Sequence, residues 1–366
     1  MRTRLIVEQF DPVRPKPGGI DTCIRGLVKF APDTEIIRIA GVDAIGDKVL
    51  GEWKEYEIGG RRFDFMPVVR LDHADLTRRI PHSVRLARGL KKFLPTADVD
   101  TVQTHRVNVG AVALRHFRGT PHVQFMHSSG DANLKQGSVS FFRRARGLYR
   151  FLERRVVRQS RAVVIFSSGG AERLRQQSAS VHFSPTWFDP TEFYPSASER
   201  SEKVNVLWAC RIEPAKNPEL AIAAFALLDE RFRLTVAGSG TLEGRMREAA
   251  AATGIAHRVD FRGAVPKGEV GALMREHDLL LMSSRFEGFS RSIVEALATG
   301  LPVATTPGGD PNALIVEGVN GARASRDDSA ELAAAVERAS AASAAVARAS
   351  VEELNAPLIV DTILSK

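Results

Sequence analysis

The stretch that decides the fold of this chain runs from Phe286 to Gly321 and reads FEGFSRSIVEALATGLPVATTPGGDPNALIVEGVNG. Four consecutive apolar residues at 279–282 precede it and predict a buried strand. Gly288, in the loop that follows, permits close approach of the backbone to a ligand. Ser290 is of a residue type that begins helices as the N-cap. The stretch therefore predicts a buried strand, a ligand-facing loop and a helix.

Hydrogen-bond donors and acceptors suited to a ligand lie close together in this loop and in the helix after it. The amides of Phe289 and Ser290 would carry the partial positive charge of a helix start, which suits anionic or hydroxyl-rich ligands. Glu287 in the loop and Glu295 in the helix could accept hydrogen bonds from two sets of hydroxyls on one extended ligand. Spacing alone leaves an alternative open, in which Glu287 helps to cap the helix and Glu295 is a surface residue.

Strand-like and helix-like segments alternate along the whole chain, as in α/β proteins with parallel sheets. The predicted strands are 5–7, 35–40, 63–69, 100–103, 122–126 and 162–166 in the first half, and 205–209, 233–237, 259–262, 279–282 and 303–305 in the second. Two Rossmann-like, doubly wound domains follow, with a ligand cleft expected between them at the carboxyl ends of the strands.

A segment rich in proline and aromatic residues, SPTWFDPTEFYPS at 184–196, separates the two series and predicts a connector. We expect an N-terminal domain over 1–186, a linker over 187–201 and a C-terminal domain over 202–349. The tail, 350–366, is expected to rejoin the N-terminal domain. The Ala/Ser-rich stretch 333–350, near the end of the chain, predicts a helix of small residues.

The net charge of +8 is concentrated in two segments, 78–92 and 143–161. The second predicts a basic amphipathic helix. The apolar residues at helical spacing are Phe141, Ala145, Leu148, Leu152 and Val156. Two interpretations stay open: a core-packed helix with a solvated basic face, and attachment to an anionic inner leaflet.

Composition excludes several classes of protein. Hydrophobic residues make up 44% and charged residues 26%, as in soluble globular proteins. No apolar run is long enough to span a bilayer, and Glu8 interrupts the first one, which argues against a signal peptide. Cys23 and Cys210 are isolated, which fits reduced, incidental thiols. We expect a cytoplasmic protein, with peripheral attachment to the inner face of the plasma membrane as an option.

Three patterns resemble sites that we do not expect. D-V-D at 98–100 has the form of a magnesium motif but leads into a predicted strand. His73, His82 and His105 have no spacing that indicates zinc. The glycines of 238–244 approximate a dinucleotide motif whose third glycine is one residue late. We therefore predict neither a metal nor a cofactor.

Several motifs in one order carry a family resemblance. E-G-F-S-x-x-x-x-E-A, G-x-P-V-x-x-T-x-x-G-G and E-G-x-N-G resemble the donor-site signature of glycosyltransferase family 4, whose members are retaining enzymes of the two-domain GT-B fold. Further matches lie along most of the chain: P-x-P-G-G-I at 15–20, P-H-V-Q-F-M-H at 121–127, C-R-I-E-P-A-K-N-P-E-L at 210–220, V-A-G-S-G at 236–240 and V-D-F-R-G at 259–263.

The resemblance implies roles for the charged residues of the second half. Arg211 and Lys216 would hold the donor diphosphate, although composition alone would make them solvated surface charges. Two fixed cations can stabilise a departing diphosphate without a metal ion. Glu295 would bind the ribose hydroxyls and Glu287 the transferred sugar, assisted by the amides of 288–290.

It also implies roles in the first half and for the base. Amides of Gly18 and Gly19 would contact the diphosphate, and His127 would hydrogen-bond the donor sugar. A packed histidine at a strand end is the alternative for His127. Arg262 is a candidate contact to the nucleotide base.

Two departures from the family pattern affect the expected contacts. Arg291 and Ser292 stand where many relatives carry apolar residues, which would alter contacts to the donor sugar. Ser128, Ser129 and Gly130 follow His127 in place of the commoner glycine, which affects the acceptor side.

The predicted reaction moves a hexose-type sugar from a nucleoside-diphosphate sugar to an acceptor hydroxyl with retention. No carboxylate pair at glycosidase spacing supports a double displacement. The basic segments favour a lipid-linked glycan or glycolipid acceptor. A soluble small-molecule acceptor and a nucleotide-sugar epimerase of the same fold are the alternatives. Nucleic acid is not expected as a partner, because surface aromatics do not alternate with the basic residues.

Overall fold

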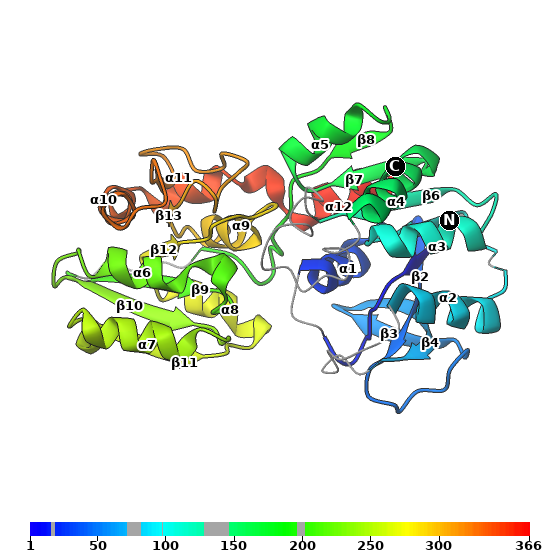
Figure 1. Cartoon of the computed structure of the whole chain (residues 1–366), viewed down its shortest axis with the longest axis horizontal. Helices are drawn as coiled ribbons and strands as arrows, with labels where there is room; N and C mark the ends of the chain where they lie inside the picture. Colours follow the sequence, from blue (N-terminus) through cyan, green and yellow to red (C-terminus); the bar gives the residue numbers. More distant parts are fainter. Residues whose placement is uncertain (16–18, 72–81, 97, 128–145, 196–201) are drawn as a thin grey trace. The chain divides into compact units, whose positions relative to one another are not determined.

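The computed structural model describes residues 1–15, 19–71, 82–96, 98–127, 146–195 and 202–366. The chain divides into two compact units. The first unit comprises Met1–Pro185 and Pro357–Lys366, and the second comprises Thr186–Ala356. Each unit has its own parallel sheet with helices on its faces (Figure 1).

The sheet of the first unit has the strand order β3-β4-β2-β1-β5-β6-β7-β8. Its pairs are parallel except for the antiparallel pair of β3 and β4. The strands are β1 (Arg2–Val7), β2 (Glu35–Asp43), β3 (Lys54–Ile58), β4 (Arg61–Arg70), β5 (Thr101–Thr104), β6 (His122–Met126), β7 (Ala162–Ile165) and β8 (Val181–Phe183).

Helices cover both faces of this sheet. They are α1 (Gly19–Phe30), α2 (His82–Phe93), α3 (Val107–His116), α4 (Arg146–Gln159), α5 (Ser168–Arg175) and, from the end of the chain, α12 (Ala356–Leu364). Leu5 and Val7 pack in a core with Leu86 and Leu90 of α2. Arg4, on the same strand, is buried and its Nη2 donates to the Leu364 carbonyl (2.6 Å), which fastens the end of α12 to β1.

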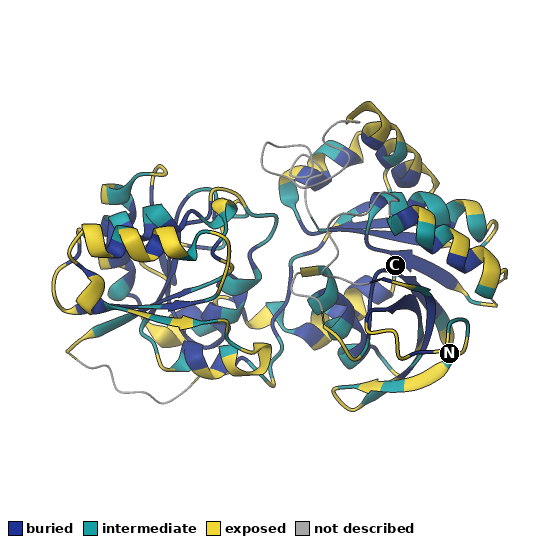
Figure 2. Ribbon diagram, turned by 60° about the horizontal axis from the view of Figure 1, so that its bottom comes forward, coloured by how far each residue is buried: buried dark blue, intermediate teal, exposed yellow. Residues whose placement is uncertain are grey.

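The second unit has a six-stranded sheet in the described residues, in the order β11-β10-β9-β12-β13-β14. The strands are β9 (Val204–Ala209), β10 (Phe232–Ala237), β11 (Val259–Gly263), β12 (Leu279–Met282), β13 (Val303–Thr305) and β14 (Gly321–Arg323). The helices are α6 (Pro218–Phe225), α7 (Glu243–Ala252), α8 (Val270–Arg275), α9 (Arg291–Ala298), α10 (Ser329–Ser340) and α11 (Ala344–Ala349). The central strands β12 and β13 are buried on both faces, as is typical of parallel sheets, whereas the edge strand β11 is partly exposed (Figure 2).

The expected linker is partly wrong, because its described part packs on the second unit. Phe188 and Phe193 are buried in the core of that unit, and Phe188 forms a β-bridge with Asn355. The tail that returns to the first unit accordingly begins at Pro357, later than expected. Aromatic side chains after prolines were the signal that the segment is buried.

Two expected helices also differ. The Ala/Ser-rich stretch forms two helices, α10 and α11, which a turn at 341–343 separates. In α4 the buried face consists of Tyr149, Glu153, Val156 and Val157, so Leu148 is exposed and not part of the core face. Phe141 and Ala145 lie outside the described residues.

Both sheets reverse their strand order at one point, where ligands of α/β proteins bind. In the first unit β1 lies between β2 and β5, so the reversal falls between β1 and β5. In the second unit β9 lies between β10 and β12, so it falls between β9 and β12. The loops that follow these four strands are therefore the places to look for function.

Candidate active site

An ion pair joins the two loops at the reversal point of the second unit. Lys216 ends a short 3₁₀ helix after β9 (Pro214–Lys216), and its Nζ contacts Oε1 of Glu287, in the loop after β12. Ser284 Oγ donates to the same carboxylate oxygen (2.9 Å). The two charged side chains keep 20% and 16% of their surface exposed, so each is accessible to a ligand. Glu287 therefore lies beside a cation in the loop that precedes the helix.

The loop after β9 packs against the backbone at 238–240. Gly238 has φ +153°, and a Cβ there would lie 1.9 Å from the Cys210 carbonyl oxygen. A Cβ at Gly240 would likewise lie 2.4 Å from the Ile212 carbonyl oxygen, so the glycines at 238 and 240 are a packing requirement of this loop. Ser283 Oγ donates to the Lys216 carbonyl (2.7 Å) and accepts from Trp208 Nε1 (3.0 Å). Lys216 consequently has a fixed backbone position.

Arg211 lies two residues after the end of β9 and is exposed. It stands on the same loop as Lys216, so the two cations predicted to hold a diphosphate share one element. Cys210 beside it is not a candidate nucleophile, because burial raises the pKa of its thiol to about 12.

The loop after β12 leads into α9 as predicted. Ser290 is at the N-cap position, but its hydroxyl is directed to Met282 Sδ (3.4 Å) and makes no side-chain cap. The Gly288 carbonyl accepts from Asn312 Nδ2 (2.9 Å), and Phe289 packs against the core. A Cβ at Gly308 would lie 2.1 Å from the Arg285 carbonyl oxygen. The backbone of the G-G motif at 308–309 therefore packs directly against the loop after β12.

Glu295, on α9, is largely buried and pairs with Arg291 one turn earlier (3.5 Å). Burial raises the pKa of its carboxyl group, while Arg291 and Lys267 oppose that shift. This position contradicts the alternative of a surface residue. Arg291 also donates to Thr186 Oγ1 (2.9 Å) and lies over the Trp187 ring, so its departure from the family pattern has a structural partner.

The remaining predicted residues lie at separate places. Arg262, on β11, is exposed and paired with Asp260. Gly19 is the first residue of α1, and Gly18 lies outside the described residues, as do Ser128, Ser129, Gly130 and His73. Asp100 accepts the Thr3 amide (2.8 Å), so the D-V-D sequence joins a loop to β1.

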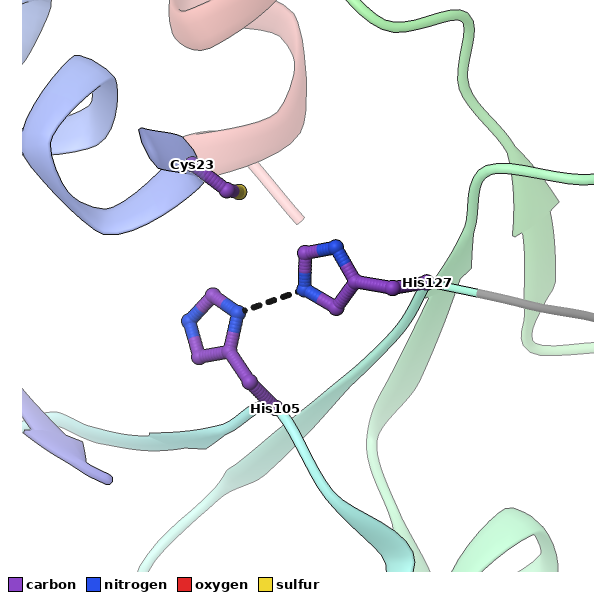
Figure 3. Close-up of side chains that lie close together, drawn as sticks. All are labelled: Cys23, His105 and His127. Atoms are coloured by element: carbon purple, nitrogen blue, oxygen red, sulfur yellow. Dashed lines mark hydrogen bonds between the residues drawn. The ribbon is translucent and has the colours of Figure 1, made fainter. Parts of the chain in front are cut away.

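In the first unit three side chains from different elements meet. Cys23 of α1, His105 after β5 and His127 after β6 place one potential ligand atom each within 4.8 Å of the others (Figure 3). His105 Nδ1 and His127 Nε2 are hydrogen-bonded (2.9 Å). His127 was predicted from the family motif. Sequence reasoning missed Cys23 and His105, whose separation along the chain hides their proximity.

Family models match both halves of the chain. Residues 191–350 match the model described as glycosyl transferases group 1, and residues 47–187 match a glycosyl transferase 4-like domain. The chain belongs to the GT-B glycosyltransferases of family 4 type.

Curated relatives are distant. A D-inositol 3-phosphate glycosyltransferase from Pseudarthrobacter chlorophenolicus is 25% identical over 279 residues, which cover 70% of this chain and 66% of the relative. A mannosylfructose-phosphate synthase from Agrobacterium fabrum is 27% identical over 146 residues, 34% of this chain and 32% of the relative. The matched parts thus span between about a third and two thirds of these relatives.

Solved structures show the same fold. Sucrose-phosphate synthase from Thermosynechococcus elongatus superposes with a TM-score of 0.81 at 17% identity and covers 100% of this chain and 98% of its own. HepE from Anabaena, in complex with UDP and glucose, gives a TM-score of 0.74 at 18% identity, with coverages of 100% and 98%. At such identities the likeness concerns the fold alone.

Proposed function

We propose that this glycosyltransferase moves a hexose-type sugar from a nucleoside-diphosphate sugar to an acceptor hydroxyl, with retention at the anomeric carbon and without a metal ion. The Lys216–Glu287 ion pair carries the proposal. In this pair a cation suited to a phosphate and a carboxylate suited to sugar hydroxyls lie side by side at the reversal point of the sheet. The bound UDP of the Anabaena neighbour supports a nucleotide-sugar donor.

The chemistry assigned to each residue follows from its charge. Arg211 and Lys216 stabilise the negative charge that develops on the departing diphosphate. Glu287 accepts hydrogen bonds from the transferred sugar, and Glu295 from the ribose. The acceptor hydroxyl attacks the anomeric carbon on the face from which the diphosphate departs. The leaving phosphate oxygen takes the proton of that hydroxyl. His127 hydrogen-bonds the sugar near the reacting carbon.

A donor screen followed by a double substitution tests this function. A donor that binds the folded protein raises its melting temperature, so thermal shifts with UDP-, GDP-, ADP- and TDP-sugars identify the base. With that donor, Arg211→Ala/Lys216→Ala should lower kcat/KM by roughly 10³ or more. Arg245→Ala, a surface ion-pair partner of Glu219 in the same unit, is the control. Parental turnover by the double variant, full dependence on Mg²⁺, or epimerisation of the donor without an acceptor would contradict the proposal.

The described part of α4 supports a membrane-borne lipid-linked glycan or glycolipid as acceptor. Leu148 and Phe151 are 50% and 62% exposed. They share this helix surface with exposed Arg155 and Arg158. Apolar side chains beside arginines are typical of helices that lie on anionic membranes. Among the helices that the structure describes, none has the length and apolar character to cross a bilayer.

Liposome partition tests the membrane proposal. The protein should sediment with vesicles that contain phosphatidylglycerol, and less so as salt rises. Phe151→Ser with Arg155→Glu and Arg158→Glu should abolish sedimentation and leave transfer to a water-soluble acceptor analogue unchanged. Arg231→Glu with Arg245→Glu, in the second unit, alters charge equally and serves as control. Equal partition of both variants would favour a soluble acceptor.

A further inference from the structure

A row of hydrogen bonds leads from β1 to the candidate sugar-binding histidine within the first unit. Arg4 Nη1 donates to Gln103 Oε1 (3.2 Å). Gln103 Nε2 contacts His105 Nε2 (2.9 Å), and His105 Nδ1 contacts His127 Nε2 (2.9 Å). Arg4, Gln103 and His105 are all buried, with 2%, 0% and 3% of their surface exposed, whereas His127 is half-buried.

The first link fixes the orientation of the glutamine amide. A guanidinium has only donors, so the Gln103 oxygen must face Arg4. Arg4 is itself held, because its Nε pairs with Glu35 (3.1 Å) and its Nη2 donates to the Leu364 carbonyl. The NH₂ group of Gln103 therefore points to His105, and a donor there requires an unprotonated Nε2 on the ring.

The proton of His105 is thus located. Burial, followed by His127 and Arg106, holds the pKa of His105 well below its ordinary value, so the ring is neutral and carries a single proton. With Nε2 accepting from Gln103, that proton is on Nδ1. His105 Nδ1–H then donates to His127 Nε2, and a neutral His127 has its own proton on Nδ1.

We propose that Arg4, Gln103 and His105 are positioning residues that fix His127 as its Nδ1–H tautomer. His127 then donates a hydrogen bond to an oxygen of the donor sugar. It cannot serve as the general base for the acceptor hydroxyl, since its basic nitrogen is occupied by His105. The inference rests on the proposed function, and it agrees with proton transfer to the leaving phosphate oxygen.

The same geometry argues against the other use of this cluster, a zinc site formed by Cys23, His105 and His127. A metal-bound histidine donates its second N–H to an acceptor such as a carboxylate or carbonyl. A metal on His105 Nδ1 would put a proton on Nε2, facing the NH₂ group of Gln103. The amide cannot turn to relieve this contact, because Arg4 would then face an NH₂ group as well.

Nitrogen NMR of the ¹⁵N-histidine-labelled protein tests the assignment directly. Two-bond ¹H–¹⁵N correlations distinguish protonated from unprotonated ring nitrogens, and His105→Gln and His127→Gln variants assign the signals. We expect both rings to be protonated on Nδ1 and unprotonated on Nε2. A proton on Nε2 of either ring, or a change of the spectrum when EDTA is added, would overturn the inference.

Substitution of the glutamine tests what the tautomer does. Gln103→Leu removes the donor to His105 and should convert the His127 signals to a mixture of tautomers. It should also lower kcat by about tenfold, the effect of one hydrogen bond, with little change in the donor KM. Gln124→Leu is the matched control, because Gln124 is equally buried on β6 and bonds carbonyls of Thr104 and Phe125. It should leave tautomer and kcat unchanged.

The outcomes separate the two proposals. Unchanged kcat in Gln103→Leu, with altered tautomers, would overturn the positioning role while donor turnover by the parent protein still supports glycosyl transfer. Absence of turnover with any nucleotide sugar would instead remove the proposed function. The same fall in kcat in Gln124→Leu would reduce Gln103 to a general stabilising residue and overturn the inference.

Discussion

The polar sites of the two units differ in their electrostatics, because one is made of charged side chains and the other mostly of neutral ones. In the second unit charged side chains meet: Lys216 with Glu287 and Arg291 with Glu295. In the first unit the residues next to His127 form a neutral chain, and the one cation that begins it, Arg4, is buried and paired with Glu35. Lys216 and Glu287 follow the two strands that flank the reversal point of their sheet, whereas in the first unit His105 follows β5, which flanks it, and His127 follows the next strand, β6.

The difference follows from what each site is proposed to bind. A diphosphate brings negative charge that increases as the bond to the sugar breaks, so preorganised, accessible cations are useful there. A sugar hydroxyl is neutral, and a hydrogen bond of fixed direction suffices to orient it. The carboxylates of Glu287 and Glu295, which are proposed to bind hydroxyls, each lie beside a cation, so their charges keep a partner in a partly buried site.

The largest effect that would test this comparison is removal of the carboxylate from the charged site. Glu287→Gln should lower kcat by about 10²- to 10³-fold, because the amide can no longer accept from the sugar as a carboxylate does. The nucleoside diphosphate should bind equally or more tightly, since Lys216 loses its competing anion. Steady-state kinetics with product inhibition by the nucleoside diphosphate measures both quantities.

Glu213→Gln is the control for this change. Glu213 lies on the loop after β9, which also carries Lys216, and accepts from Thr241 Oγ1 (2.9 Å). Its variant should keep kcat within about twofold, as expected for an exposed hydrogen bond. A parental kcat in Glu287→Gln would show that Glu287 only neutralises Lys216.

The charged site could be predicted from sequence far better than the neutral one. Glu287 and Glu295 stand within one contiguous motif, and the motif also fixes the strand, the loop and the helix that carry them. Gln103, His105 and Cys23 have no such signal, because only the parallel pairing of β1, β5 and β6 brings their elements together. Gln103 would pass for an ordinary polar residue in a strand.

The same contrast holds for the fold. Central strands were located to within one to three residues, since continuous apolar runs mark parallel strands buried on both faces. β3 was missed because its residues, KEYEI, are mostly charged, as an exposed edge strand allows. The short strands β8 and β14 were missed because three residues carry little periodicity.

Acid should destabilise the first unit before the second. The pKa of His105 lies well below its ordinary value and burial lowers that of His122 to about 4, so below pH 6.5 the unfolded chain takes up protons that the folded unit does not. Each such histidine costs about 1.6 kcal/mol between pH 6.5 and pH 5. In the second unit the raised pKa of Glu295 has the opposite sign and offsets the lowered pKa of His277.

Tryptophan fluorescence can separate the units. In a Trp53→Phe variant the emission comes from Trp187 and Trp208, both buried in the second unit. At pH 5 thermal unfolding followed by circular dichroism should begin below the fluorescence transition, whereas at pH 7 the two should lie closer. His122→Asn should reduce the pH dependence of the first transition. A second unit that unfolds first at pH 5 would contradict the prediction.

The smallest expected effect concerns Arg291, the departure from the family pattern. Arg291→Leu removes the cation that opposes the raised pKa of Glu295, so that pKa should rise further. Because only the carboxylate can accept from both ribose hydroxyls, donor affinity should then be lost at a higher pH than in the parent protein. At pH 8 the two proteins should bind donor similarly, and at pH 6 the variant should bind about threefold to tenfold more weakly. Arg291→Lys retains the charge and should keep the parental pH profile, whereas a loss of affinity that is equal at both pH values would assign Arg291 to packing on Trp187.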